Sequence, residues 1–172
     1  MKNKTELLDL FISESGLKFG PKIISKLEVL NTFAVPSLMT EIPNETFKDC
    51  HSLNNVKFHS KVTFIGLKAF SNCEFLNNVS IPPSITEIGK GSFENCKRLN
   101  KITFESQSKL NLIDDFAFKG CIALNKVEIP PSVKRIGNHA FSGCDKLQDI
   151  SIPSSLNIDN IGISSNVIVI LI

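Results

Sequence analysis

Apolar residues recur along this chain at a spacing much longer than the period of a helix or a strand. A Phe-x-x-Cys group occurs five times, at Phe47/Cys50, Phe70/Cys73, Phe93/Cys96, Phe118/Cys121 and Phe141/Cys144. Successive copies begin 23, 23, 25 and 23 residues apart, and a leucine follows each cysteine by three positions. A period of this length is typical of a solenoid, in which each repeat forms one coil and neighbouring coils share a core.

Each of these leucines opens a Leu-x-x-φ-x-φ pattern, where φ is apolar, as in LNKVEI at residues 124–129. The last two apolar residues alternate with polar ones, which predicts a short strand with one buried side. A worn earlier copy, LNTFAV, occupies residues 30–35. We expect the strands of successive coils to form one parallel sheet, with equivalent residues about 4.8 Å apart.

The remainder of each repeat predicts turns. Pro-Pro-Ser ends the strand in two repeats, because proline has no N–H to donate. A second apolar pair follows, such as Val133 and Ile136, and then Gly137, which we expect at a turn with positive φ. The Phe-x-x-Cys group that comes next predicts a short helical turn.

Both ends of a solenoid need covering, and both ends of this sequence offer an apolar segment. Near the N-terminus, Thr5 is suited to cap a helix carrying Leu7, Leu8, Phe11 and Ile12, which predicts a helical cap. Near the C-terminus, NVIVILI (residues 166–172) predicts a closing strand. If exposed, that strand would be a site of self-association.

Taken together, the pattern resembles the BspA-like class of leucine-rich repeats found in anaerobic bacteria and protists. The matching features are the Leu-x-x-φ-x-φ strands, Ile-Pro-Pro-Ser at 81–84 and 129–132, Ile-Gly at 88–89 and 136–137, and the Ala-Phe-x-x-Cys groups. The resemblance implies an α/β fold: a right-handed solenoid with a concave parallel sheet, short helical turns and an N-terminal helical cap. We divide the chain into residues 1–29 (cap and degenerate first repeat), 30–153 (repeats) and 154–172 (partial repeat and closing strand).

Composition narrows the function classes. The net charge of +2 over 172 residues gives no basic field for nucleic acid. The 13 phenylalanines, without Trp or Tyr, indicate core filling rather than ligand binding. No apolar run is long enough to span a membrane. Glu6 and Asp9 interrupt the N-terminal apolar stretch, so it makes a poor signal peptide, and we predict a cytoplasmic protein.

Candidate chemistry is sparse. The cysteines share one position of the repeat without any CxxC pair, which predicts buried structural thiols and fits a reducing compartment. His51, His59 and His139 occupy three different repeat positions, so we predict no metal site and no catalytic base. Amides at 31, 54, 77, 100 and 125, with Gln148, are predicted to satisfy backbone groups between coils. We predict no enzyme activity and no cofactor.

The strands predict a candidate binding surface. Their alternation places polar residues of mixed charge on the outer, concave side, which the resemblance implies is the usual binding face. The candidates are Asn55, Lys57, Asn78, Ser80, Lys101, Thr103, Lys126, Glu128 and Asp149. The alternative is a solvated sheet face with no partner, because the set lacks the Trp, Tyr and Arg of a typical hot spot.

One repeat departs from the pattern and suggests a more specific partner. Where two other copies have IPPSITEIG and IPPSVKRIG, this one has FHSKVTFIG (residues 58–66). Phe64 aligns with Glu41, Glu87 and Arg135, so we expect it to face outward, although Leu112 in the same register shows that the position also accepts an apolar residue. Lys61, Val62 and Phe64 resemble the short motif by which regulators bind protein phosphatase 1 as an added strand. Against this, Val62 shares the register of core residues, and Lys101–Phe104 fits the same motif within a core strand.

We therefore predict a non-catalytic, cytoplasmic protein-interaction scaffold, with the catalytic subunit of protein phosphatase 1 as a possible partner. The alternative is a cell-surface adhesion or recognition module, which requires export of the chain.

Overall fold

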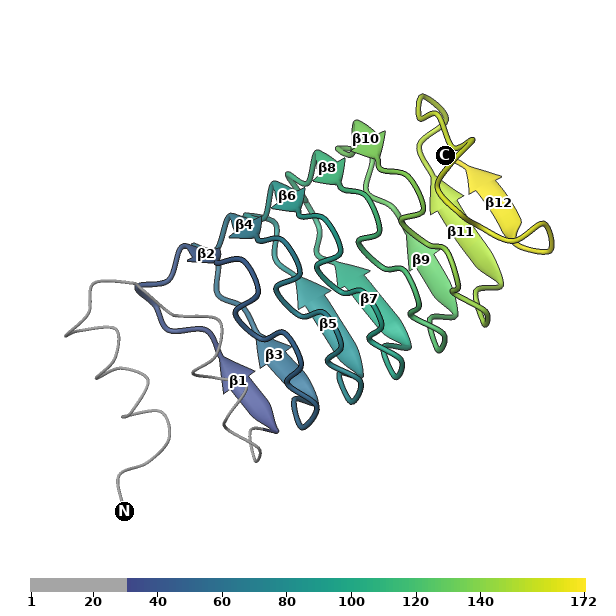
Figure 1. Cartoon of the computed structure of the whole chain (residues 1–172). Coiled ribbons are helices and arrows are strands. Elements are labelled where there is room, and N and C mark those ends of the chain that lie inside the picture. Colours follow the sequence, from purple (N-terminus) through teal and green to yellow (C-terminus); the bar gives the residue numbers. More distant parts are fainter. Residues whose placement is uncertain (1–30) are drawn as a thin grey trace, which may run out of the picture.

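A computed structural model describes residues 31–172, and these residues form a parallel β-solenoid of stacked coils (Figure 1). One side of the solenoid is a seven-stranded parallel sheet with the order β1-β3-β5-β7-β9-β11-β12. Its strands are β1 (Thr32–Ala34), β3 (Asn55–Lys57), β5 (Asn78–Ile81), β7 (Lys101–Phe104), β9 (Lys126–Glu128), β11 (Asp149–Ile152) and β12 (Ile168–Leu171). The predicted solenoid and its parallel sheet are confirmed.

A second parallel sheet, which the sequence did not predict, lies on another side of the coils. Its two-residue strands are β2 (Glu41–Ile42), β4 (Phe64–Ile65), β6 (Glu87–Ile88), β8 (Leu112–Ile113) and β10 (Arg135–Ile136), in the spatial order β10-β8-β6-β4-β2. In every one of these strands the second residue is buried, so this sheet closes the core opposite the longer strands.

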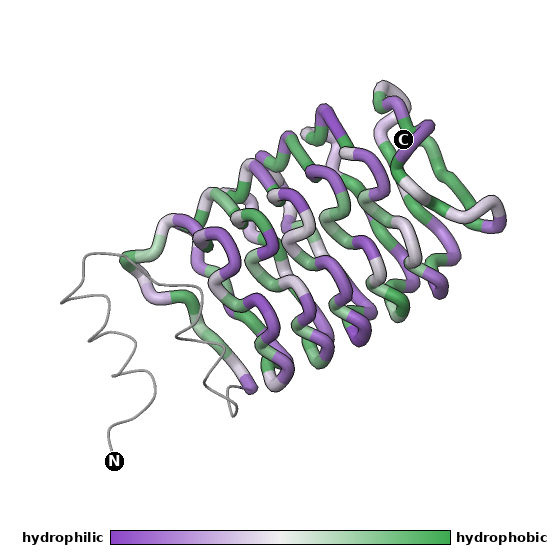
Figure 2. Tube along the Cα trace, viewed as in Figure 1, coloured by the Kyte–Doolittle hydropathy of each residue, from purple (hydrophilic) through white to green (hydrophobic). Residues whose placement is uncertain are grey.

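Phenylalanine rings form the centre of the core. Phe47, Phe70, Phe93, Phe118 and Phe141 are almost fully buried, and neighbouring rings stack nearly parallel with centroids 4.9, 5.2, 5.4 and 5.4 Å apart. This spacing follows from the distance between adjacent parallel strands. Figure 2 shows hydrophobic stretches recurring at corresponding places in successive coils. The Phe ladder predicted from the sequence is therefore confirmed.

The predicted short helical turns are wrong, and with them the predicted α/β class, because residues 31–172 contain strands and turns alone. No helix occurs in residues 31–172, and the Phe-x-x-Cys segments are runs of tight turns. Two residues at each segment lie in the left-handed region, one two positions before the phenylalanine and one directly before the cysteine, with φ between 51° and 73°. The first of these is Glu45, Lys68, Gly91, Phe116 or His139, and the second is Asp49, Asn72, Asn95, Gly120 or Gly143. Such residues end a right-handed helical turn as soon as it begins.

Backbone hydrogen bonds in these turns alternate between two coils. Around Phe70, the N–H groups of Ala69, Ser71 and Cys73 donate to carbonyls three residues earlier in the same coil. The N–H groups of Lys68, Phe70 and Asn72 donate to the next coil instead, and Phe70 reaches the Ser92 carbonyl at 2.7 Å. Half of the donors that a helix would use internally therefore join neighbouring coils.

The role predicted for Gly137 also needs correction. Its φ is not among the positive values, so conformational freedom does not explain the glycine. A Cβ atom at this position would lie 2.3 Å from the Asp115 backbone nitrogen and 2.6 Å from the Asp114 carbonyl carbon. Gly137 is thus required by the close approach of the preceding coil.

The predicted helical cap at residues 5–12 lies outside the described residues. The predicted closing strand is confirmed as β12, which pairs with β11 in parallel from Asp149↔Ile168 to Ile152↔Leu171. No helix in residues 31–172 has the length and apolarity needed to cross a membrane.

Candidate functional site

All nine candidates from the strand pattern lie on the seven-stranded sheet, with their side chains directed away from the core. We call this surface the sheet face. Asn55 and Asp149 are half-buried, and the other seven are exposed. The parallel register aligns them into two rows, Asn55-Asn78-Lys101-Lys126-Asp149 and Lys57-Ser80-Thr103-Glu128. The structure thus brings together side chains that are nearly 100 residues apart in the sequence.

Charge is unevenly distributed on the sheet face. The Lys126 Nζ lies 3.4 Å from both Glu128 Oε1 and Asp149 Oδ1. The hydrogen bond to Glu128 and the negative charge of Asp149 raise the pKa of Lys126 above its usual value. Neither Lys57 nor Lys101 forms an ion pair within residues 31–172. The two unpaired cations lie over β3 and β7, and the neutralised cluster lies over β9 and β11.

Two hollows mark the sheet face. The smaller lies over β3, β5 and β7, between Phe58 and Glu105. The larger has a volume of about 1110 Å³, lies over β7, β9 and β11, and is bordered by Glu105, Ser106, Gln107 and Ser108 on one side and Ile172 on another. The segment 105–108 follows β7 in the one 25-residue repeat, and Ser80 Oγ donates to Glu105 Oε1 at 2.8 Å. Sequence reasoning missed this border, although the two-residue excess was its signal.

The proposed phosphatase motif lies at the five-stranded sheet, away from the sheet face. Lys61 is exposed, Val62 is fully buried, and Phe64 is half-buried in β4 on the five-stranded sheet. The outward, solvent-exposed Phe64 expected from the sequence is therefore only partly correct. β4 pairs with β2 on one side and β6 on the other, so it has no open edge for an added strand.

The five cysteines are buried and unpaired, as predicted, but they do more than fill space. Each of four thiols donates a hydrogen bond to a phenylalanine carbonyl of the preceding coil, for example Cys73 Sγ to Phe47 O at 3.0 Å and Cys96 Sγ to Phe70 O at 3.2 Å. Burial raises the pKa of the Cys50 and Cys144 thiols to about 12. A thiol of this kind is neither a nucleophile nor a metal ligand at neutral pH.

The histidines do not converge. His139 stacks on Phe116 with ring centroids 5.6 Å apart, whereas the His59 Nε2 lies 2.9 Å from the Pro36 carbonyl oxygen. Within the part of the chain that the structure describes, no group of three His, Cys, Asp or Glu side chains has the geometry to hold a metal ion.

Comparison with family models assigns this repeat pattern. The model described as the BspA type leucine rich repeat region matches six copies, over residues 17–111 and 104–165. The chain belongs to this family. The resemblance inferred from the repeat residues is thereby confirmed, and bacterial leucine-rich repeat proteins are its structural neighbours.

Several solved structures share the fold. The leucine-rich repeat protein of T. pallidum has a TM-score of 0.69 and 32% sequence identity, with 72% of this chain and 59% of that chain covered. The pneumococcal vaccine antigen PcpA has a TM-score of 0.62 and 26% sequence identity, with 77% of this BspA-type chain and 34% of the antigen covered. A leucine-rich repeat protein of Eubacterium ventriosum has a TM-score of 0.60 and 25% sequence identity, with 74% of this chain and 34% of that chain covered. This chain spans less than two thirds of each, and no curated protein matches it.

Proposed function

We propose that this BspA-type chain is a recognition module that binds a protein partner on the sheet face. The observation that carries the proposal is the contrast between the two sides of each strand. The inner positions are apolar in every strand, whereas the outer positions change from Asn to Lys to Asp along one row. A constant core under a varied polar surface is what a solenoid needs to recognise one partner.

The hollows and unpaired lysines support the same surface. A partner that fills both hollows would contact the cations Lys57 and Lys101 over β3 and β7, and the acidic residues Glu128 and Asp149 over β9 and β11. Such a change of charge along the sheet specifies the orientation of the bound partner.

The test compares two charge-reversed surfaces. Immobilised wild-type chain, a sheet-face variant (Lys57→Glu with Lys101→Glu) and a control variant on the five-stranded side (Lys134→Glu with Arg135→Glu) would capture proteins from the native cell, quantified by mass spectrometry. We expect the control to retain the captured set and the sheet-face variant to lose it. Equal capture by all three would refute the sheet face as the binding surface.

The location of the protein is a separate proposal. We propose that it acts in the cytoplasm; the alternative is recognition at the cell surface, and the related PcpA is described as a vaccine antigen. The cysteines do not favour either, because buried thiols with raised pKa values resist oxidation in any compartment. Labelling of intact cells with a membrane-impermeant reagent separates the two, since only an exported protein is labelled.

The narrower hypothesis of phosphatase 1 binding remains a prediction. Burial of Val62 and the paired edges of β4 give it no support, because the motif needs an extended strand with both apolar side chains available. Calorimetric titration with a phosphatase 1 catalytic subunit, using wild type and Phe64→Ala, decides it. No heat with wild type would end the hypothesis; binding lost in a folded Phe64→Ala variant would support it.

We also propose that β12 mediates self-association. It is the last strand of the seven-stranded sheet, and Ile168, Ile170 and Leu171 are 64%, 41% and 62% exposed. An apolar strand with an open edge is a template for pairing with a second copy. Analytical ultracentrifugation of wild type and of the Ile168→Lys/Ile170→Lys variant tests this. We expect wild type to form dimers or larger species and the variant to stay monomeric. Wild type that stays monomeric when its concentration is raised 100-fold would refute the proposal.

A further inference from the structure

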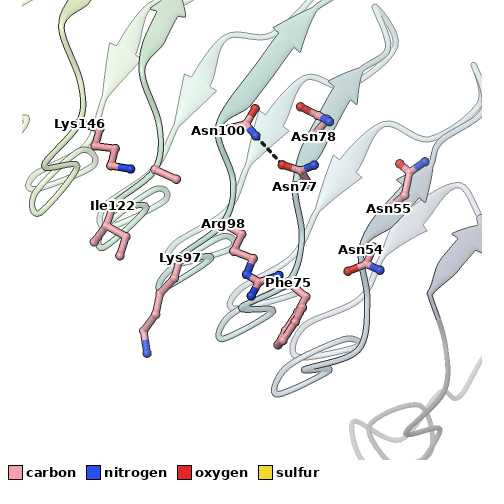
Figure 3. A pocket seen from close by; sticks show the side chains of 11 residues that line it. Asn54, Asn55, Phe75, Asn77, Asn78, Lys97, Arg98, Asn100, Ile122 and Lys146 are labelled. Carbon is pink, nitrogen blue, oxygen red and sulfur yellow. Dashed lines mark hydrogen bonds between the residues drawn. The ribbon is translucent and has the colours of Figure 1, made fainter.

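A third hollow lies beside the sheet face, where the chain enters the strands (Figure 3). Its outer wall is formed by the two residues between cysteine and leucine in successive repeats, including Phe75, Arg98, Ile122 and Lys146. Its inner wall is the row of amides before each strand, Asn54, Asn77 and Asn100, with Asn55 and Asn78 joining it to the sheet face. We call this hollow the rim hollow.

The rim hollow is lined by positive charge. Its lining contains three cations, Lys97, Arg98 and Lys146, and no carboxylate. Lys97 is paired with Glu74 at 2.8 Å, but Arg98 and Lys146 have no carboxylate partner within residues 31–172. Two unneutralised cations therefore line the hollow, on the coils before and after Ile122 (Figure 3).

Apolar groups accompany these charges. Phe75 and Ile122 are each 41% exposed, and they are two of the few large apolar side chains exposed between the ends of the described solenoid. The Arg98 guanidinium carbon lies 4.1 Å from the centroid of the Phe75 ring. This cation–π contact places the guanidinium over the ring, beside the apolar surface of the hollow.

The amide row supplies exposed hydrogen-bonding groups along the hollow, with one amide on each coil. The sequence predicted that these amides satisfy backbone groups, but the backbone satisfies itself, as Asn77 N donates to Asn54 O and Asn100 N to Asn77 O. The side chains of Asn54, Asn77 and Asn100 are exposed, and Asn100 Nδ2 donates to Asn77 Oδ1. Each amide both donates and accepts, as a peptide group does.

From this combination we infer that the rim hollow binds an extended acidic peptide segment of the partner, with an aliphatic side chain against Phe75 and Ile122. The carboxylates pair with Arg98 and Lys146, and the peptide groups bond to the amide row. A peptide fits better than a nucleic acid or a sulfated polysaccharide, because two isolated cations alternate with apolar surface rather than forming a continuous basic track. The inference deepens the proposed function and rests on it.

The test uses fluorescence anisotropy with the full chain and two fluorescein-labelled 12-residue peptides. One alternates Glu with Leu, and its matched control alternates Gln with Leu. The variants are Arg98→Gln and Lys146→Gln, and the control variant is Lys134→Gln, an exposed cation near β10 on the five-stranded side. Each substitution removes one charge, so all three change the net charge equally.

We expect the Glu peptide to bind more tightly than the Gln peptide, with about a fivefold loss for each rim variant and less than a twofold loss for Lys134→Gln. The inference is overturned if both peptides bind alike, if neither binds, or if Lys134→Gln weakens binding as much as Arg98→Gln. It is also overturned if single-stranded DNA or heparin fragments of equal charge compete as well as the Glu peptide.

The outcome is separable from that of the proposed function. If the peptides fail while the Lys57→Glu/Lys101→Glu variant still loses captured proteins, the sheet face is supported and the rim hollow is not part of the site. If both experiments fail, the protein-binding proposal falls together with this inference.

Discussion

Replacing Phe93 by alanine tests the account of the core most directly. Its side chain is fully buried, and its ring stacks against Phe70 at 5.2 Å and Phe118 at 5.4 Å, nearly parallel to both. Removal of a buried phenylalanine ring costs about 3–5 kcal/mol of unfolding free energy, from lost transfer and the cavity left behind. Because both neighbours are held by their own coils, the cavity cannot collapse, and we expect the upper half of that range.

A second variant separates stacking from burial. Phe93→Leu keeps most of the apolar volume but removes two ring contacts, each contributing about 0.5–1.5 kcal/mol. We therefore expect Phe93→Leu to lose about 1–3 kcal/mol, and Phe93→Ala clearly more.

Urea unfolding followed by circular dichroism measures both losses, since the chain has no Trp or Tyr for fluorescence. With a slope of about 2 kcal/mol per molar urea, the alanine variant should unfold at a urea concentration about 2 M lower. A loss below about 1 kcal/mol for Phe93→Ala would show that the rings do not form a continuous core. Equal losses for alanine and leucine would show that the stacked geometry contributes nothing.

The remaining predictions concern the thiols and one glycine. None of the five cysteines should react with a thiol reagent such as DTNB at pH 8 until urea unfolds the chain, and fast reaction in native buffer would contradict their burial. Because folding raises the pKa of Cys50 and Cys144 from 9.0 to about 12, the folded state holds more protons between these values. Stability is therefore full below pH 9 and should fall as the pH rises towards 12; a flat profile in urea titrations from pH 8 to 11 would contradict this. Gly137→Ala should lose about 1–3 kcal/mol through its clash with the Asp115 backbone, whereas Lys134→Ala, two residues before Ile136, should change the midpoint little.

Most of the core and of the sheet face could be predicted because both follow from strict repetition. Phe93 and Leu99 had to be buried since their equivalents are apolar in neighbouring repeats, and Lys101 had to face outward by alternation. The helical turns were wrong for a physical reason. Periodicity records which side chains are buried, whereas the left-handed residues are set by backbone contacts between coils.

Of the two left-handed positions in each repeat, only the second carries a sequence signal. The position before each cysteine holds Asp49, Asn72, Asn95, Gly120 or Gly143, the residue types that best tolerate positive φ. The first left-handed position includes Phe116 and His139, which are not residue types that favour positive φ. The rim hollow was missed because its lining comes from five successive coils, and side chains such as Phe75 and Arg98 meet only after the coils stack.

The alternating hydrogen bonds of the turns have a consequence for how such a molecule changes length. In these turns each coil offers equivalent N–H donors to the next coil and equivalent carbonyl acceptors to the previous one. The junctions between neighbouring coils are therefore equivalent. Duplication or deletion of one 23-residue unit within the gene would move the downstream coils as a body and leave each junction intact. The 25-residue repeat shows that a coil also tolerates extra residues, which leave the strand register unchanged and form the border at 105–108. Lineages carrying this architecture can therefore alter the extent of their outer surface in whole steps without redesigning the interior.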